Sequence, residues 1–153
     1  MSEELGKYSL KLAGNTYTSN EAGDVTIHQN WEGTADSFGT VFGTLIFGPT
    51  PPSSLNEGGK IKWVSQAFLD DGTTVVGQGE GTWETPPNAH VAKTSLLINI
   101  SDGTQVRSEG EMALESLEWN GTIYRMGKNP QAKPLATANP SNIGYESVNV
   151  IPA

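Results

Sequence analysis

The sequence contains no cysteine, and this absence removes several classes of chemistry. Disulfides, thiolate nucleophiles and cysteine-based zinc sites are excluded. The two histidines, His28 and His90, lie far apart and belong to no metal-binding spacing, so the sequence predicts no metal site and no cofactor. The length of 153 residues predicts one domain, which is large enough to bury a hydrophobic core without disulfide bonds or bound metal ions.

Basic residues are also scarce. Nine lysines and arginines stand against 17 acidic residues, which gives a net charge of −8, and no basic cluster interrupts this balance. Such a surface repels phosphates and anionic lipids. We therefore expect neither nucleic acid nor membrane as a partner, and a preference for neutral or cationic molecules.

Long apolar runs are absent. No stretch approaches the ~20 residues of a membrane-spanning helix. The first residues, Met1-Ser2-Glu3-Glu4-Leu5, are acidic where a signal peptide is basic. Together with the lack of cysteine, these features predict a soluble protein of the cytoplasm.

Helical periodicity is missing too, and alternating segments rich in β-branched and aromatic residues recur instead. The 18 glycines and 9 prolines are spread between these segments, as turns require. Several segments reach the length that tilted barrel strands need. We predict an all-β fold, a single antiparallel barrel of about eight strands, calycin-like in type, formed by 7–13, 24–32, 39–47, 60–69, 73–83, 92–101, 105–117 and 122–126.

The barrel domain is predicted to span 1–126, followed by a tail over 127–153. The tail is rich in Pro, Asn and Ala, and we expect it to extend along the barrel or onto a neighbouring subunit. Tyr145, Val148 and Ile151 give it apolar groups to bury. A homo-oligomer formed through this tail is therefore one expectation.

Two Asp-Gly pairs, Asp71-Gly72 and Asp102-Gly103, stand between alternating segments and predict hairpins, because glycine adopts positive φ readily. Asn120-Gly121 is a third candidate turn. A two-residue loop at Asp71-Gly72 would place Trp63 opposite Glu80.

The second hairpin has two candidate registers. A two-residue loop pairs Ile98 with Arg107. A three-residue loop pairs Ile100 with Val106 and separates apolar from charged positions, so we favour it.

Gly77, Gly79 and Gly81 share one side of a predicted strand, where interior glycine needs a reason. One reason is tight barrel curvature, which we favour because barrels generally need glycine at corners. The other is a ligand that approaches the backbone closely.

Glu80 is the candidate catalytic residue. A carboxyl group held against the Trp63 indole inside a barrel would be desolvated, which raises the pKa of such groups and suits proton transfer. The competing interpretation is a solvated outer face, where Gln78 and Glu80 are ordinary surface residues. We weigh this as the more frequent outcome, because unpaired glutamate is seldom fully buried.

Further ligand-binding candidates are polar and aromatic positions of the predicted strands. Arg107 and Glu109 lie two positions apart, so they share one face of the strand and can form an ion pair. Successive charged side chains on one face usually indicate that this face is exposed to solvent. The aromatic residues can line a cavity or fill the core. The full candidate set beside Glu80 is Trp63, Gln66, Gln78, His28, Arg107, Glu109 and Tyr124.

Four short patterns resemble allene oxide cyclase-like small β-barrels: Gln29-x-Trp31-x-Gly33, Gly39-Thr-Val-Phe-Gly43-Thr, Gly77-x-Gly79-x-Gly81 and Ser108-Glu109-Gly110. The resemblance implies a barrel that holds an apolar ligand, and some relatives of this type steer cyclisations or isomerisations. No residue of this chain matches the catalytic set of such an enzyme.

Three functions stay open at this point. The first is a barrel that binds a small, mostly apolar, uncharged molecule, and acts as a cyclase or isomerase if it is an enzyme. The second is a non-enzymatic, oligomerising barrel whose interior is filled. The third is a carbohydrate-binding module, which would need exposed coplanar tryptophans.

Overall fold

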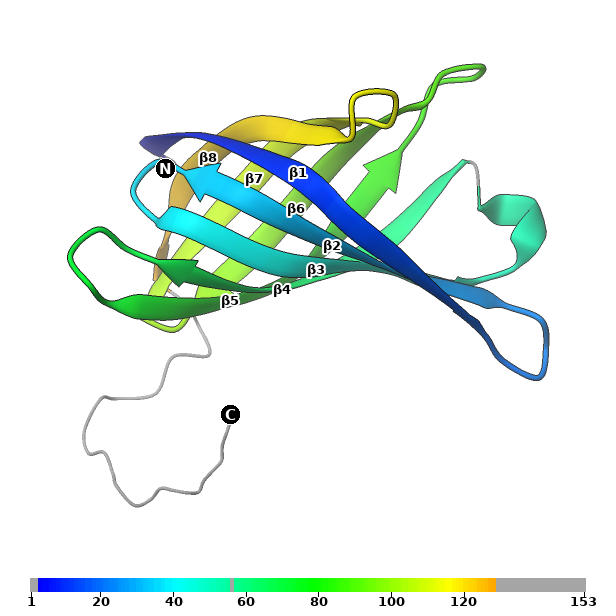
Figure 1. The fold of residues 1–153 in the computed structure, drawn as a ribbon, viewed down its shortest axis with the longest axis horizontal. Coiled ribbons are helices and arrows are strands. Elements are labelled where there is room, and N and C mark those ends of the chain that lie inside the picture. Colours follow the sequence, from blue (N-terminus) through cyan, green and yellow to red (C-terminus); the bar gives the residue numbers. More distant parts are fainter. Residues whose placement is uncertain (1–2, 56, 129–153) are drawn as a thin grey trace.

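A computed structural model describes residues 3–55 and 57–128, and these residues form one β-barrel with a single short 3-10 helix (Figure 1). The helix, η1, spans Pro52–Ser54. Within the described residues, no helix has the length and apolar character to cross a membrane. The strands are β1 (Glu3–Ser19), β2 (Val25–Ala35), β3 (Gly39–Thr50), β4 (Gly58–Phe68), β5 (Thr74–Glu84), β6 (Val91–Ile100), β7 (Thr104–Ala113) and β8 (Glu118–Lys128).

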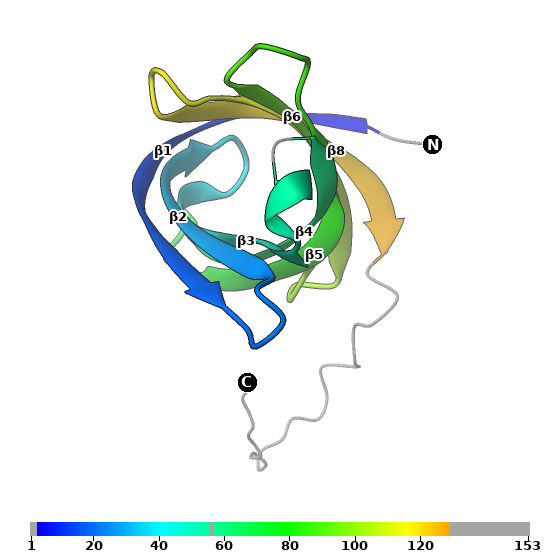
Figure 2. The same cartoon turned by 90° about the vertical axis from the view of Figure 1, so that its right-hand side faces the viewer.

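Each strand pairs antiparallel with the next one along the chain, and β1 pairs with β8 to close the ring (Figure 2). The predicted all-β, antiparallel barrel of eight strands is thus confirmed. Because β8 continues to Lys128, the predicted tail begins inside a strand, and its remainder, 129–153, lies outside the described residues.

The two ends of the barrel differ in the turns they carry. We call end A the one where β1 begins, with the β2–β3, β4–β5 and β6–β7 turns; it lies on the left of Figure 1. End B carries the remaining turns, and η1 lies across its opening (Figure 2).

Both Asp-Gly pairs form turns, as predicted, but in loops of three residues. In each loop the glycine N–H donates to the residue before the loop, from Gly72 to Leu69 and from Gly103 to Ile100, both at 3.0 Å. The two glycines have φ of 92° and 98°. A three-residue loop with a left-handed glycine at its end is a common hairpin connection.

The extra loop residue changes the first hairpin. Trp63 pairs with Gly79 rather than with Glu80, so the predicted register is wrong by one position. A slip of one residue moves every side chain to the other face. Gly77 and Gly79 therefore face the interior with Trp63, and Glu80 faces outward.

In the second hairpin the predicted separation of faces is correct but the register is off by two, since Ile98 pairs with Val106. Asn120-Gly121 is not a turn. β7 ends at Ala113 and the chain reverses over 114–117, where Leu117 has a φ of 60°. Gly121 instead lies within β8, opposite Gly110.

The glycines of β5 are required by the tight curvature of the barrel, which is the reason that the sequence favoured. A Cβ atom on Gly79 would overlap the backbone oxygen of Leu97, and one on Gly81 would overlap that of Ser95. Both oxygens belong to β6. Glycine therefore lets β5 and β6 bend together at this point of the barrel.

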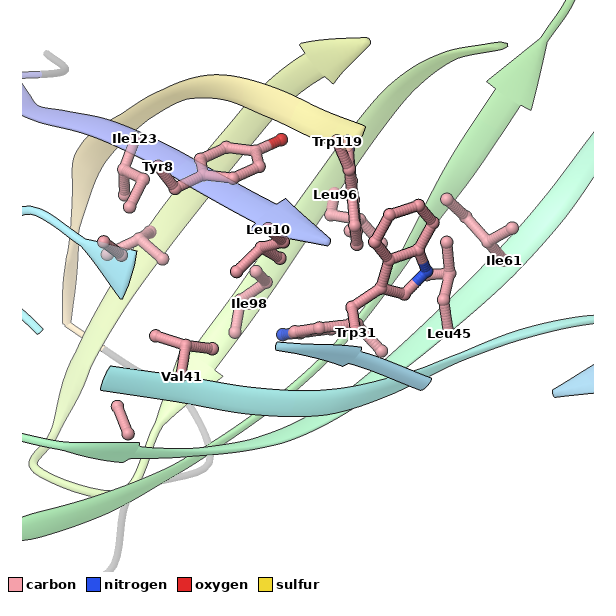
Figure 3. Close-up of a cluster of buried hydrophobic side chains, with 14 of the residues drawn as sticks. Tyr8, Leu10, Trp31, Val41, Leu45, Ile61, Leu96, Ile98, Trp119 and Ile123 are labelled. Carbon is pink, nitrogen blue, oxygen red and sulfur yellow. The ribbon is translucent and has the colours of Figure 1, made fainter. Parts of the chain in front are cut away.

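The middle of the barrel is filled by tryptophan. Trp119 packs edge-to-face against Trp31 and Trp63, with ring centroids 5.4 and 5.2 Å apart, and all three are buried in the core. Figure 3 shows Trp31 and Trp119 among the other buried side chains. Towards end B, Phe47 and Trp83 meet in the same manner at 5.5 Å. The indoles thus form a packed layer that separates end A from end B.

Candidate functional site

The described residues enclose one apolar cavity in the end-A half of the barrel, with a volume of about 70 Å³. It exists because the inward positions there carry small side chains. On β4 these are Ser65 and Ala67, and on β5 they are Val75 and Gly77. Further from end A, β4 carries the bulky inward residues Ile61 and Trp63, and β5 carries Trp83, so the barrel is filled on one side and hollow on the other.

The tryptophan layer forms the floor of the cavity through Trp63 and Trp119. Phe38, in the β2–β3 turn, lies at its mouth. The backbone of Lys7 on β1 holds this turn through two hydrogen bonds: its N–H donates to Asp36 Oδ2 at 2.8 Å, and its carbonyl accepts the Asp36 N–H at 2.9 Å. The chain thus fixes an aromatic ring at the partly open end of an apolar space.

Besides the indole nitrogens of Trp63 and Trp119, three side chains of the cavity wall carry polar atoms: Tyr8, Ser65 and Ser108. Ser108 Oγ donates to the Tyr8 hydroxyl at 2.9 Å, and both residues are buried. Ser65 Oγ donates to the Gly77 carbonyl at 3.2 Å, so its proton is already engaged. The polar character of the cavity therefore centres on the Tyr8–Ser108 hydroxyl pair.

Tyr8 is the one titratable residue among those that line the cavity. Burial raises its pKa from 10.0 to about 12, against the opposing effect of hydrogen bonds with Ser108 and Thr94. At neutral pH the phenol is consequently protonated, which makes it a hydrogen-bonding group and not a base.

Two glycines make room for the Tyr8 hydroxyl. Gly121 pairs with Tyr8 on one side and with Gly110 on the other. A Cβ atom at either glycine would overlap the hydroxyl group. This glycine pair therefore provides a niche in the barrel wall that fits a hydroxyl and no larger group.

The sequence interpretation missed Tyr8 and Ser108. A signal exists in the pattern Trp-x-Gly-Thr, which occurs at 31–34 and again at 119–122 and puts Trp119 and Gly121 on the same inward side of β8. A glycine two positions from a buried tryptophan indicates that another side chain crosses the strand there. The sequence does not say which side chain does so.

Of the predicted site residues, only Trp63 lines the cavity. Glu80 is exposed on the outer face, where it pairs with Lys62 and Leu97, and the desolvated carboxylate expected there is not formed. Gln66 and Gln78 are exposed on the same face. His28 is partly buried on the outer side of β2.

Arg107, Glu109 and Tyr124 do come together, but outside the barrel. Arg107 Nε lies 3.5 Å from Glu109 Oε2, and its guanidinium carbon lies 4.6 Å from the centre of the Tyr124 ring. Ser95 Oγ donates to Glu109 at 2.5 Å. Arg107 and Glu109 thus form a partly exposed ion pair on the outer wall, with the Tyr124 ring packed against the guanidinium.

The outer wall also exposes apolar side chains over β3, β4 and β5. We call this the outer patch: Phe42, Val64, Phe68 and Val76, each 37–47% exposed. Phe42 and Phe68 meet edge-to-face at 6.0 Å. A shallow groove beside Gly43 continues the patch towards β2. A contiguous apolar area of this kind is a recognised feature of interaction surfaces.

Comparisons with protein-family models, with curated proteins and with solved structures find no match to this chain. Its function is therefore argued from the geometry of the site. Within the described residues, no group of three or more acidic or histidine side chains is placed to hold a metal ion. What the structure defines is a closed eight-stranded barrel with a small apolar cavity, one hydroxyl pair in its wall and one aromatic ring at its mouth.

Proposed function

We propose that this protein binds a small, mostly apolar, uncharged molecule in the end-A cavity. The observation that carries the proposal is the placement of Ala35, Ala67 and Gly77 at inward positions, where their small side chains leave the apolar cavity open. An eight-stranded barrel is just wide enough for a filled core or for one small ligand. The sequence resemblance to barrels that hold apolar ligands points in the same direction.

The volume of the cavity sets the size of the ligand. An engineered apolar cavity of about 150 Å³ stays dry and binds benzene or xenon. At about 70 Å³, this cavity accepts a xenon atom or a fragment of a few heavy atoms. A larger ligand has to extend through the mouth and displace Phe38.

The ligand is expected to be neutral because no charged side chain lines the cavity. A buried carboxylate without a cationic partner would lose its hydration at a large free-energy cost. Outside the mouth, Asp36, Asp70 and Asp71 line one surface of the end-A turns. Their charge further disfavours the approach of anions.

Binding is favoured over proton-transfer catalysis. Tyr8 is protonated at neutral pH, and Glu80, the carboxylate predicted to move protons, faces outward. A cyclase or isomerase at this site would have to act by shaping its substrate.

Xenon binding followed by ¹²⁹Xe NMR tests the proposal with a probe that fits the cavity. We expect saturable binding to the native chain and its loss in Ala67→Leu, which fills the cavity. Gln66→Leu adds the same side chain to the opposite face of β4 and is the matched control. Absence of xenon binding to the native chain, or unchanged binding in Ala67→Leu, would refute the proposal.

A second candidate function, an oligomerising barrel, is favoured by the outer patch. The outward positions of β3 to β5 between Thr40 and Thr44, between Val64 and Phe68, and between Thr74 and Gln78 carry no charge. Two copies with a net charge of −8 each repel one another, so an uncharged face is where they can approach.

Native mass spectrometry and light scattering test the oligomer. If the patch is an interface, the chain forms a discrete oligomer that Phe42→Lys converts to monomers, whereas Leu97→Lys, on the outer face of β6, does not. A native chain that is monomeric at high concentration would remove this candidate.

A further inference from the structure

We infer that the ligand of the end-A cavity carries one uncharged oxygen, a carbonyl or a hydroxyl, and that the Tyr8–Ser108 hydroxyl pair binds this oxygen. The inference rests on the proposed function, since it needs a ligand in the cavity. It adds the chemical class of that ligand and the two residues that select it.

Position is the first argument. Tyr8 and Ser108 line the cavity together, and the surrounding wall is apolar, with Ile98, Val106 and Ile123 beside them. The Tyr8 hydroxyl lies on the side of its ring that faces Trp119 (Figure 3). A ligand in this space contacts hydrocarbon almost everywhere except at the hydroxyl pair. Such a site fixes the orientation of its ligand by one polar contact.

The number of hydrogen-bond donors is the second argument. Trp119 Nε1 donates to Thr94 Oγ1 at 3.0 Å, and Ser108 Oγ donates to Tyr8. The Tyr8 hydroxyl accepts the bond from Ser108, so its own proton is the one left to donate, either to Thr94 beside it or to a ligand oxygen in the cavity.

The construction of the niche is the third argument. Gly110 and Gly121 leave room for a hydroxyl at this point of the wall. A phenylalanine would fill the space of the Tyr8 ring without needing Ser108 as a partner. Two interior glycines weaken their strands. A binding role for the hydroxyl explains why the fold holds a polar group there.

A pair of ligands with one shape tests the inference. Acetone and 2-methylpropene differ only in an oxygen in place of a methylene group, and their four heavy atoms match the size that the cavity volume sets. Fluorescence reports their binding, because Trp63 and Trp119 line the cavity. The quantity compared between variants is the ratio of the two dissociation constants.

We expect Tyr8→Phe to shift this ratio about tenfold against the ketone, the usual effect of losing one buried hydrogen bond. Ser108→Ala shifts it in the same direction. Tyr124→Phe removes a hydroxyl from the outer wall and leaves the ratio unchanged. The double variant Tyr8→Phe/Ser108→Ala removes both partners, leaves no buried hydroxyl unpaired between them, and guards against a single variant that fails to fold.

The outcomes separate the two proposals. An unchanged ratio in Tyr8→Phe and in the double variant, with both ligands still bound, overturns the role of the hydroxyl pair and leaves the cavity as a binding site. If neither ligand binds to the native chain while xenon does, the inferred ligand class is wrong but the cavity is accessible. If xenon fails to bind as well, the proposed function and the inference fall together.

Discussion

At the scale of single residues, Tyr8 joins folding to the candidate site. Its ring packs edge-to-face on Trp119, with centroids 5.7 Å apart, so it belongs to the core. Its hydroxyl lies in a niche shaped by Gly110 and Gly121 and bonds to Ser108. Substitution of this one side chain therefore tests a packing contact and a polar contact separately, since phenylalanine keeps the first and removes the second.

The raised pKa of Tyr8 predicts a loss of stability in alkali. Because its folded-state value of about 12 exceeds the 10.0 of an unfolded tyrosine, the neutral phenol stabilises the fold fully below pH 10. This contribution falls away as the pH rises from 10 through 12. The size of the shift corresponds to about 3 kcal/mol in the free energy of unfolding.

Urea unfolding between pH 8 and pH 12 measures this effect. The native chain should lose stability more steeply than Tyr8→Phe, whereas Tyr124→Phe, which lacks an outer hydroxyl, should follow the native chain. Parallel curves for the native chain and Tyr8→Phe would show that Tyr8 is not held in its neutral form by the fold.

At the scale of elements, the turns decide which face of each strand looks inward. The β4–β5 and β6–β7 loops share the sequence Asp-Gly-Thr and the same contacts. Asp71 Oδ1 accepts the N–H of Thr73 at 2.9 Å and its hydroxyl at 2.6 Å, and Asp102 does the same with Thr104 at 2.9 and 2.7 Å. These hydrogen bonds lower the pKa of Asp71. The chain thus specifies the same three-residue loop twice.

Alanine at the loop glycines is predicted to destabilise the barrel. Gly72 and Gly103 have positive φ, which an L-residue with a Cβ adopts at a cost of about 1–2 kcal/mol. We expect similar losses of unfolding free energy for Gly72→Ala and Gly103→Ala in urea titrations. Asp70→Ala, in the same loop but exposed, should stay near the native value. Equal stability of Gly72→Ala and Asp70→Ala would mean that the loop does not depend on its left-handed residue.

Loop length also explains what the sequence could and could not predict. The alternation of apolar and polar residues predicted the approximate positions of all eight strands, because each strand buries one face. Asp-Gly located two turns but left the number of loop residues open, and one residue was enough to turn Glu80 from the interior to the surface. The Asp-Gly-Thr pattern was the available clue, since the threonine gives the aspartate its partner.

The cavity was beyond prediction for a different reason. Its wall combines residues from all eight strands, and no local pattern in the sequence states how these strands stagger in a closed ring. Tyr8 and Ser108 are 100 positions apart and come within hydrogen-bonding distance only when β1 pairs with β8. The fold was therefore predictable from short-range sequence patterns. The site was not, because it forms only when β1 pairs with β8 and the barrel closes.

At the scale of the whole molecule, the barrel is filled unevenly. Trp31, Trp63 and Trp119 pack the middle, and Phe47 with Trp83 continues the packing towards end B. End A keeps its cavity. A folded chain normally packs its interior without such voids. The uneven filling is consequently the property of the whole molecule on which the proposed function depends.

The same substitution, alanine to valine, should have different effects on stability at end A and towards end B, because only end A has free space. Ala67 lines the cavity, whereas Ala92 is buried towards end B, does not border the cavity and pairs with Met112. Ala67→Val adds two methyl groups to free space and should leave the free energy of unfolding unchanged or raise it. Ala92→Val adds them to a packed region and should lower it by about 1–3 kcal/mol. Urea unfolding measures both, and pressure unfolding adds a second readout, because filling a void reduces the volume change of unfolding in Ala67→Val alone. Equal destabilisation by the two variants, with equal pressure sensitivity, would mean that end A is as tightly packed as end B, and the barrel would then have no room for a ligand.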